Sequence, residues 1–239
     1  MSEFLRHQPC PECGSKDNCS VWDDGHEWCF GCGYYKPGVA WKTIIKKDKN
    51  ARNPIAFPVD SSDNLPIKAQ TWYKTYGLND YDAAKNKFKW SEEKQWLIMP
   101  VYGAKDDLLM YQARCFGTGP KYFTKGQPET IDHIIGENSA APVLFVVEDL
   151  LSAIKISKIA TVMPLWGSSI SNERLVRLSR SYTTLVIWLD YDKAHESVRI
   201  RERASNLFRK SFVIAHKLDP KCLAMPLLAQ NILHYKNKY

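Results

Sequence analysis

Four cysteines near the N-terminus have the spacing of a metal site. They form two Cys-x-x-Cys pairs, Cys10 with Cys13 and Cys29 with Cys32. Each pair can sit in a tight turn that points both thiolates at one point, and two such turns complete a tetrahedron around Zn²⁺. Because four sulfurs leave no open position, we expect the zinc to be structural. A segment of about 35 residues has too small a core to fold unaided, so the metal would supply its stability.

Carboxylates that directly follow apolar runs form a second group of chemical interest. The carboxyl ends of parallel strands meet at one edge of a sheet, so we expect these side chains to converge there. Asp190 and Asp192 are separated by one residue, and in extended geometry both side chains would leave on one side. Converging carboxylates repel each other unless a divalent cation lies among them, and hard oxygen ligands suit Mg²⁺ or Mn²⁺. The group consists of Glu148, Asp190, Asp192 and Asp219.

Both groups of residues also have plainer explanations. Aspartate at the end of a strand is a common turn residue, and Asp219 stands before a proline as many turn-starting residues do. Between the cysteine pairs lie Trp22 and Trp28, which either stack on the bases of single-stranded nucleic acid or only pack a small domain. These alternatives stay open at the level of spacing.

The elements that must position the carboxylates are predicted from apolar periodicity. Continuous apolar runs indicate strands that are buried on both faces, and strands that alternate with helices imply a parallel sheet. The predicted strands are 143–147, 161–163, 185–189 and 212–215, and the predicted helices are 149–159, one capped by Ser171 and Asn172, and 193–210. Ahead of this region, the runs 96–102 and 108–113 flank turn-forming residues and predict a β-hairpin.

Composition limits the class of protein. The 239 residues are 44% hydrophobic and 25% charged, which excludes a disordered chain. The formal net charge is +7, which fits a polyanionic partner such as nucleic acid. No apolar run is long enough to span a membrane and the first residues lack the apolar region of a signal peptide, so we expect no membrane contact and a cytoplasmic location. The basic, proline-containing stretch 39–66 is expected to be a linker, whose cations either hold nucleic acid or are solvated.

Both groups of residues resemble motifs of a known protein family. The cysteine pairs, with Asp24-Gly-His26 before the third cysteine, are similar to the zinc-binding domain of tailed-phage DNA primases. The carboxylates resemble those of a Toprim domain, which primases share with topoisomerases and some nucleases, and the order of the segments is typical of primases. The resemblance implies an α/β fold with an N-terminal zinc ribbon, a mixed α+β subdomain and a Toprim-like parallel sheet flanked by helices. The implied boundaries are 1–38 for the ribbon, 39–66 for the linker, 67–140 for the mixed subdomain, 141–222 for the catalytic Toprim subdomain and 223–239 for a C-terminal tail.

The resemblance also implies an activity and roles for residues. The expected enzyme is a DNA-dependent RNA primase, a nucleotidyltransferase that uses Mg²⁺ or Mn²⁺ and ribonucleoside triphosphates to make short RNA primers on single-stranded DNA for replication, in the host cytoplasm if the source is viral. Asp24 and His26 would help to read the template. Arg114, Lys121 and Lys125 would hold template and nucleotides. Asp190, Asp192 and Asp219 would bind the catalytic metal, and Glu148 would handle a proton or organise that metal. The chain has no Gly-x-x-x-x-Gly-Lys-Ser/Thr phosphate loop, so we expect a separate replicative helicase, as well as a DNA polymerase, as partners.

Three departures from the Toprim pattern keep other functions open. Asp149 stands where glycine usually follows the glutamate, Ser152 where an acid is common, and His195 where glycine is usual. A degenerate Toprim would give a protein that binds single strands without catalysis. A Toprim nuclease would use the same acids to cut DNA. A topoisomerase is disfavoured because strand passage needs a far longer chain.

Overall fold

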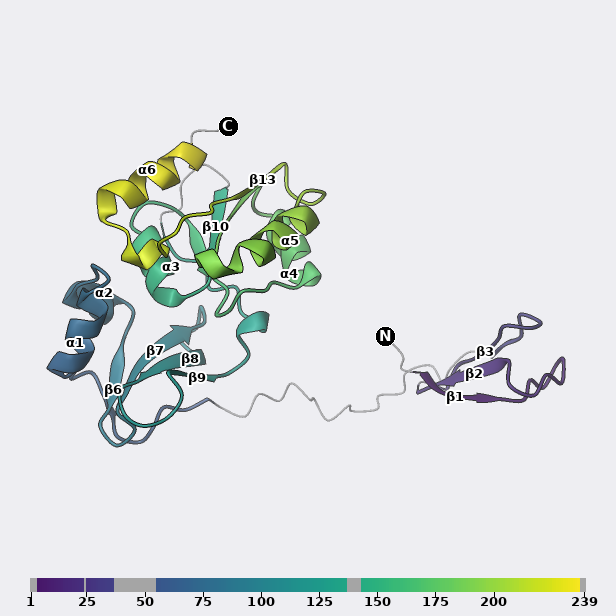
Figure 1. Cartoon of the computed structure of the whole chain (residues 1–239). Coiled ribbons are helices and arrows are strands. Elements are labelled where there is room, and N and C mark those ends of the chain that lie inside the picture. Colours follow the sequence, from purple (N-terminus) through teal and green to yellow (C-terminus); the bar gives the residue numbers. More distant parts are fainter. Residues whose placement is uncertain (1–3, 24, 37–54, 137–142, 237–239) are drawn as a thin grey trace. The chain divides into compact units, whose positions relative to one another are not determined.

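The computed structural model describes residues 4–23, 25–36, 55–136 and 143–236, and the chain forms two compact units, Met1–Asn53 and Pro54–Tyr239 (Figure 1). Two sequence predictions fall outside the described residues. One is the proposed template-reading residue Asp24. The other is the basic part of the linker, with Lys42, Lys46, Lys47, Lys49 and Arg52.

The first unit contains a small antiparallel sheet. Its strands, in sheet order, are β1 (Phe4–Gln8), β2 (Cys19–Trp22), β3 (Glu27–Cys29) and β4 (Tyr35–Lys36). Its buried apolar residues, among those that the structure describes, are Cys10, Cys19, Val21 and Cys29. Three of the four are cysteines, so the apolar core of this unit is too small to account for its folding.

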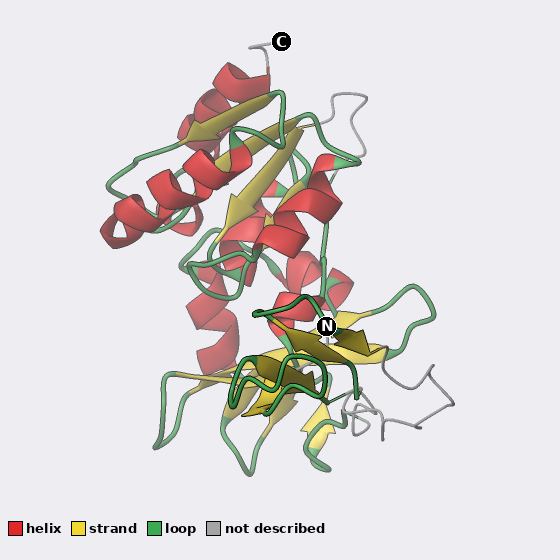
Figure 2. Cartoon of the chain, turned by 90° about the vertical axis from the view of Figure 1, so that its right-hand side faces the viewer, coloured by secondary structure: helices red, strands yellow, loops and turns green. Residues whose placement is uncertain are grey.

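The second unit contains the predicted parallel sheet, with helices on both faces (Figure 2). Its strand order is β11 (Val162–Pro164), β10 (Val143–Val147), β12 (Thr184–Trp188) and β13 (Lys210–Val213), and every neighbouring pair is parallel. The helices are α3 (Leu150–Ile156), α4 (Asn172–Ser179), α5 (Ala194–Ala204) and α6 (Met225–Lys236). No helix in the described part of the chain is long and apolar enough to cross a membrane.

The alternation of side chains along β10 explains why the whole strand is buried. Phe145 packs with residues of α3 and α6, whereas Leu144 and Val146 pack with residues of α4 and α5. A parallel strand covered on both faces requires apolar residues at every position. The continuous apolar run in the sequence was therefore a correct signal for a central strand.

Two predicted helices are shorter in the structure. The helix predicted to end at 159 ends at Ile156, and the helix predicted to end at 210 ends at Ala204. In both cases serine follows the last helical residue, and the hydroxyl group bonds to a helix carbonyl: Ser157 to Ile154 and Ser205 to Glu202, each at 2.7 Å. Serine competes in this way with the backbone hydrogen bonds that would continue a helix.

An antiparallel sheet precedes the parallel one along the chain. Its strands, in sheet order, are β5 (Ser61–Ser62), β6 (Lys89–Ser91), β7 (Trp96–Tyr102), β8 (Leu108–Cys115) and β9 (Tyr122–Lys125), and its helices are α1 (Ile67–Lys74) and α2 (Asp80–Lys85). The predicted hairpin is β7–β8. Strand β5 lies in the stretch that we expected to be a linker. Asp60 fixes this stretch to the sheet, because its carboxylate accepts hydrogen bonds from the Ser91 hydroxyl and the Glu93 N–H, both at 2.8 Å.

Helix α3 belongs to the cores of both sheets. Ala153 and Ile156 pack in the core between the parallel sheet and α6. Leu150, Leu151 and Ile154 pack with residues of α1, β6 and β7. The two sheets therefore share one helix, and the chain enters this helix directly from the central strand β10.

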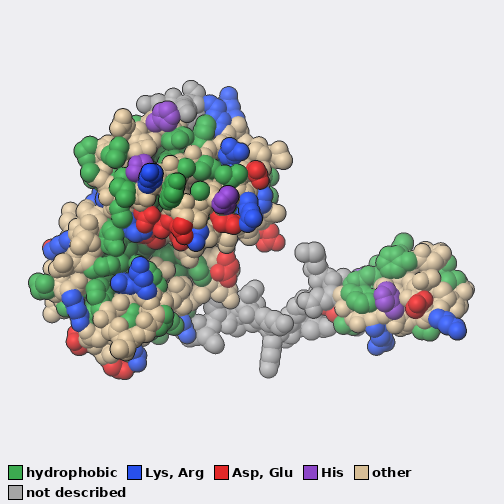
Figure 3. Space-filling model, viewed as in Figure 1, with side chains coloured by type: hydrophobic (Ala, Val, Ile, Leu, Met, Phe, Trp, Pro, Cys, Tyr) green, Lys and Arg blue, Asp and Glu red, His purple; other side chains and the backbone are tan. Residues whose placement is uncertain are grey.

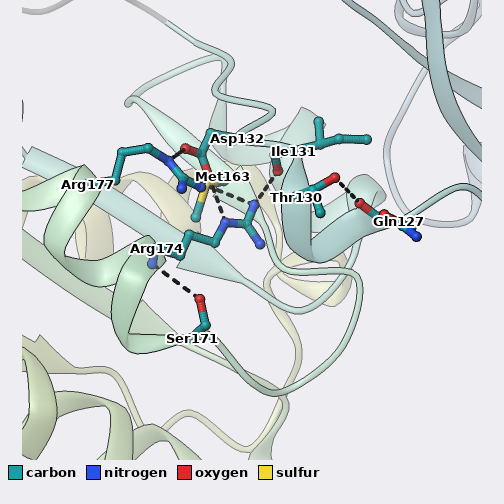
Figure 4. Close-up of polar contacts among 8 residues, drawn as sticks. All are labelled: Gln127, Thr130, Ile131, Asp132, Met163, Ser171, Arg174 and Arg177. Carbon is teal, nitrogen blue, oxygen red and sulfur yellow. Dashed lines mark hydrogen bonds and ion pairs between the residues drawn. The ribbon is translucent and has the colours of Figure 1, made fainter. Parts of the chain in front are cut away.

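The segment that joins the two sheets is held by an arginine of α4 (Figure 4). The Arg174 guanidinium, 2% exposed, donates to the Ile131 carbonyl and, at 2.7 Å, to the Asp132 carboxylate. Arg177, one turn further on, donates to the same carboxylate at 2.5 Å. Ser171 caps the N-terminus of α4, as predicted, by accepting the Arg174 N–H at 3.2 Å. This Arg174–Asp132 clamp fixes residues 131 and 132 in the connection between β9 and β10.

Candidate metal centre and active site

The four predicted zinc ligands come together in the first unit. The Sγ atoms of Cys10, Cys13, Cys29 and Cys32 all lie within 4.8 Å of one another. The Sγ–Sγ distances are 3.6 Å for Cys10–Cys32 and 3.8 Å for Cys13–Cys29. Four thiolates at Zn–S distances of about 2.3 Å would be about 3.8 Å apart in a tetrahedron. The geometry of the cluster thus fits a tetrahedral four-sulfur metal site such as that of zinc.

Two glycines shape the turns that bring these cysteines together. The Gly14 N–H bonds to the Cys10 carbonyl at 3.0 Å, and the Gly33 N–H bonds to the Cys29 carbonyl at 2.9 Å. Both glycines have a positive φ, +66° and +75°, which disfavours residues with a side chain. The Ser15 hydroxyl lies 3.4 Å from Cys13 Sγ and lowers the pKa of this thiol to about 6. At Cys13 the thiolate form that metal ligation requires is therefore favoured at neutral pH.

The predicted template-reading residue His26 forms an aromatic pair in the ribbon. Its ring stacks on Trp22 with a centroid distance of 4.2 Å and an interplanar angle of 9°. On the same small sheet, Trp28 and Tyr35 are exposed and their rings lie 6.1 Å apart. Exposed aromatic faces of this kind can stack on unpaired bases, whereas the buried core of the ribbon consists mainly of cysteines.

The predicted carboxylates meet at one edge of the parallel sheet. Glu148 directly follows β10 and Asp190 follows β12, and these two strands are parallel neighbours. Asp219 lies after β13 and pairs with a lysine, Lys221, at 2.7 Å. The same ammonium group lies 3.0 Å from Asp149 and 3.8 Å from Asp190. Figure 3 shows acidic side chains, with basic ones beside them, gathered between the parallel-sheet part and the antiparallel-sheet part of this unit.

The expected side-by-side arrangement of Asp190 and Asp192 was wrong. The strand has already ended at Trp188, and residues Tyr191–Lys193 form a 3₁₀ turn rather than extended backbone. The Asp192 side chain is 70% exposed and pairs with Lys193 at 2.7 Å. The extended geometry that would place both carboxylates on one side of a strand is therefore absent at these residues.

Burial and mutual repulsion perturb the acids at this edge. Burial raises the pKa of Asp190 to about 7, and the charges of Asp219 and Glu148 act in the same direction, against the opposing charge of Lys221. Burial likewise raises the pKa of Glu148, and the charges of Asp149 and Asp192 add to this effect. Burial opposes the charge of Lys221, but the neighbouring carboxylates outweigh it and raise the pKa of the ammonium group. The edge thus holds a permanently charged lysine together with two acids, Asp190 and Glu148, whose pKa values are raised.

The donor set of this edge suits one hard cation. Glu148 Oε2 is buried and has no hydrogen-bond partner among the described residues. Asp190 is less completely neutralised than Asp149 or Asp219, since its oxygen lies farthest from the ammonium group. Carboxylate oxygens are the ligands that Mg²⁺ and Mn²⁺ prefer. Within the described residues, however, only the four cysteines bring three or more ligand atoms within 4.8 Å of one another. Glu148, Asp190 and Asp192 would have to draw closer to hold a metal ion.

The three predicted basic residues lie on or beside the outer hairpin of the antiparallel sheet, on two different faces. Arg114 pairs with Tyr122 across the β8–β9 ladder, and its guanidinium lies 5.4 Å from the Tyr122 ring. Burial raises the pKa of Tyr122 to about 12, and the charge of Asp149 adds to this effect, so this face lies close enough to the carboxylates to sense their charge. Lys121 Nζ lies 5.7 Å from the same ring. Lys125, three residues after Tyr122 on the strand, lies on the opposite face.

Sequence reasoning missed the role of two residues of this edge. Asp149 caps α3, since its carboxylate accepts the N–H of Ser152 at 3.0 Å and the hydroxyl of Ser152 at 2.8 Å. Its place at the start of the predicted helix 149–159 was a signal for this capping role. Lys221 was overlooked altogether. A lysine two residues after Asp219, in Asp-Pro-Lys, carries no pattern that places it among carboxylates from other strands.

Proteins of known structure share this architecture. No family model matches the chain. A stretch of 36 residues is 58% identical to a DNA helicase/primase of Enterobacteria phage T3, and it covers 15% of this chain and 6% of that protein. The crystal structure of the Aquifex aeolicus primase, with its zinc-binding and RNA polymerase domains, is 13% identical, with a TM-score of 0.56 over 98% of this chain and 80% of that one. The primase fragment of the bacteriophage T7 primase-helicase is 15% identical, with a TM-score of 0.50 over 98% and 100%.

The chain has the fold of a DNA primase. Both structural matches extend over the ribbon and the two sheets, so the predicted α/β class and the predicted resemblance are confirmed. The strong local sequence match is confined to a small part of the phage protein, which is far longer than the matched segment. The primase fold therefore rests mainly on the arrangement of the elements.

Proposed function

We propose that this protein is a DNA-dependent RNA primase that makes short RNA primers on single-stranded DNA. The observation that carries the proposal is the convergence of Glu148 and Asp190 at the edge of the parallel sheet, in a chain that also holds a four-cysteine ribbon. The net charge of +7 supports a nucleic-acid template. The ribbon would hold Zn²⁺, and its exposed aromatic residues would contact template bases, with His26 in this surface.

In the proposed reaction, the 3′-hydroxyl of a growing primer attacks the α-phosphate of an incoming ribonucleotide, and pyrophosphate leaves. Asp190 and Asp192, with Glu148 beside them, would hold Mg²⁺, which would neutralise charge that develops on the phosphates. Glu148 has an unpartnered buried oxygen and a raised pKa, so it is suited to accept the proton of the attacking hydroxyl. Arg114, on the face that lies close to the acids, would hold a phosphate of the template or nucleotide. Lys121 would contribute charge beside it, and Lys125 would act from the other face.

A primer-synthesis assay tests the proposal directly. The zinc-loaded protein is incubated with random-sequence single-stranded DNA, Mg²⁺ and the four ribonucleoside triphosphates, one of them labelled. We expect short RNA products that depend on Mg²⁺ and disappear in Asp190→Ala. An equal yield from Asp190→Ala would refute the assignment. The sequences of the products would also reveal where on the template synthesis starts.

The same assay separates the two other functions that the sequence left open. Loss of labelled DNA in the presence of Mg²⁺ but without nucleotides would identify a nuclease. Binding of single-stranded DNA with no product would identify a non-catalytic accessory protein. For the second outcome the assay is repeated with a replicative helicase, because we expect a separate helicase and a DNA polymerase to be partners in replication.

A further inference from the structure

The lysine among the carboxylates is fixed on every side by described contacts. Its Nζ lies 2.7 Å from Asp219, 3.0 Å from Asp149 and 3.8 Å from Asp190, and its side chain is only 15% exposed. The ammonium group donates hydrogen bonds to Asp149 and Asp219, whereas Asp190 lies at ion-pair distance without a hydrogen bond. Asp149 is itself held by the backbone and hydroxyl of Ser152. The Lys221 ammonium therefore sits in a preformed acidic cage rather than on a flexible surface.

A second lysine fixes the backbone beneath this cage. Lys155 in α3 is 4% exposed, and its Nζ donates to the carbonyl of Lys221 and to that of Tyr76, each at 2.8 Å. The residue thus ties the loop after β13 to the loop after α1. With its backbone held by Lys155 and its side chain held by acids, Lys221 cannot leave the cage without breaking several buried contacts.

We propose that Lys221 is a resident cation that takes the place of one divalent metal ion in this site. Its ammonium group pairs with Asp149 and Asp219 and offsets part of their charge, and it leaves Glu148, Asp190 and Asp192 for a single Mg²⁺ or Mn²⁺. This inference rests on the proposed metal-dependent function. It replaces our expectation from the sequence that Asp219 is a metal ligand. Lys221 is a positioning residue in this scheme, because it acts through the carboxylates.

The proposal is tested by counting metal ions. The full-length, zinc-loaded protein is titrated with Mn²⁺ at pH 7.5 without DNA or nucleotides, and free Mn²⁺ is measured by electron paramagnetic resonance. We expect one bound Mn²⁺ per chain in the wild type and two in Lys221→Glu, where the introduced carboxylate joins Asp149 and Asp219. Lys217→Glu, the same charge change at an exposed position of the preceding loop, should still bind one. Two Mn²⁺ ions bound to the wild type, or one bound to a folded Lys221→Glu, would overturn the proposal.

A neutral substitution tests the charge alone. In Lys221→Gln we expect the Mn²⁺ dissociation constant to fall at least tenfold or a second ion to bind. The reason is that the positive charge next to Asp190, which repels a cation, is lost. Lys221→Arg keeps the charge and should still bind one ion. An unchanged count and affinity in a folded Lys221→Gln would contradict the inference. If Lys221→Glu and Lys221→Gln do not fold, the wild-type count still decides between one and two sites.

The metal count and the primer assay fail independently. A protein that binds one Mn²⁺ and gains a second in Lys221→Glu, yet makes no primers, would disprove the proposed function and keep the role of Lys221. A protein that makes primers but binds two Mn²⁺ ions would do the reverse.

Discussion

The cysteine cluster and the carboxylate cluster both bring ionisable groups together, but they differ in how the charge is balanced and what holds the fold. In the ribbon, three of the four buried apolar residues that the structure describes are cysteines. At the sheet edge, the acids lie above a large apolar core, and a lysine of the chain itself pairs with Asp149 and Asp219. Under the proposed function, a metal in the ribbon would be needed for folding, whereas a metal at the sheet edge would be needed for chemistry.

Because of this difference, loss of the metal ion should affect the two clusters in different ways. The ribbon should depend on its metal for folding, because bound zinc contributes on the order of 10–16 kcal/mol to such small domains. The parallel sheet should be stable without a metal ion at its acids, since apolar residues pack on both of its faces. Substitutions in the first cluster should therefore change folding, and substitutions in the second should change activity.

The largest effect is expected from a cysteine of the ribbon. In Cys29→Ser one thiolate ligand is lost, so bound zinc should fall to near zero and the ribbon should unfold, while the second unit keeps its melting temperature. Zinc content by elemental analysis and protease sensitivity of the N-terminal unit measure this. Cys222→Ser, outside the cluster, is the control and should keep its zinc. If Cys29→Ser keeps a full complement of zinc, the ligand set is wrong.

An acid of the sheet edge should show the opposite behaviour. We expect Asp192→Ala to lower the rate of primer synthesis at least a thousand-fold, which corresponds to about 4 kcal/mol of transition-state stabilisation. Its melting temperature should stay within a few degrees of the wild type, because the side chain is mostly exposed. Asp63→Ala, an exposed acid paired with Lys89, is the matched control for activity. Primer synthesis at the wild-type rate in Asp192→Ala would remove this residue from the site.

A buried ion pair tests how far apolar packing alone accounts for the stability of the second unit. Arg174→Met should lower the free energy of unfolding by about 3 kcal/mol, because it breaks a buried pair and leaves Asp132 with one partner. Arg177→Met removes the half-exposed partner and should cost less than about 1 kcal/mol. Urea denaturation measures both values. Equal losses for the two variants would show that burial of Arg174 does not set its contribution.

The smallest effect concerns the charge of Asp190 without added Mg²⁺. Its pKa in the folded protein, about 7, is above its usual value near 4, so the stability that this group contributes is present below pH 4 and is lost as the pH rises through 7. Asp190→Asn removes this dependence. Relative to the wild type it should gain roughly 1–2 kcal/mol at pH 8, after allowance for solvent screening, and nothing near pH 4. Urea denaturation at several pH values measures the difference, and parallel curves across this range would contradict the prediction.

The sequence predicted the elements well where one physical rule dominates. The apolar run Val143–Val147 is a strand with the predicted bounds, because burial on both faces tolerates no polar residue. The two Cys-x-x-Cys pairs predicted the metal cluster, because the spacing within each pair sets the turn. The pattern along 185–189 placed the next strand to within a residue.

The parts that could not be predicted depend either on contacts between distant segments or on small local differences in free energy. Lys221 and Asp149 are 72 residues apart, and nothing in their local sequence indicates that they meet. The 3₁₀ turn at 191–193 and the serines that end two helices are local competitions with small energy differences. The face of the sheet on which Lys125 lies depends on a contact between strands, since the register of β9 is set by its pairing with β8.

The shared helix α3 has a consequence for synthesis on the ribosome. Strands β5–β9 leave the exit tunnel first, but Leu150, Leu151 and Ile154, which complete their core, are made afterwards. Until then the nascent antiparallel sheet exposes the apolar surface that these side chains will cover, and such surfaces promote association with other chains. Translation that pauses before residue 150 would therefore prolong the stage at which this apolar surface is exposed.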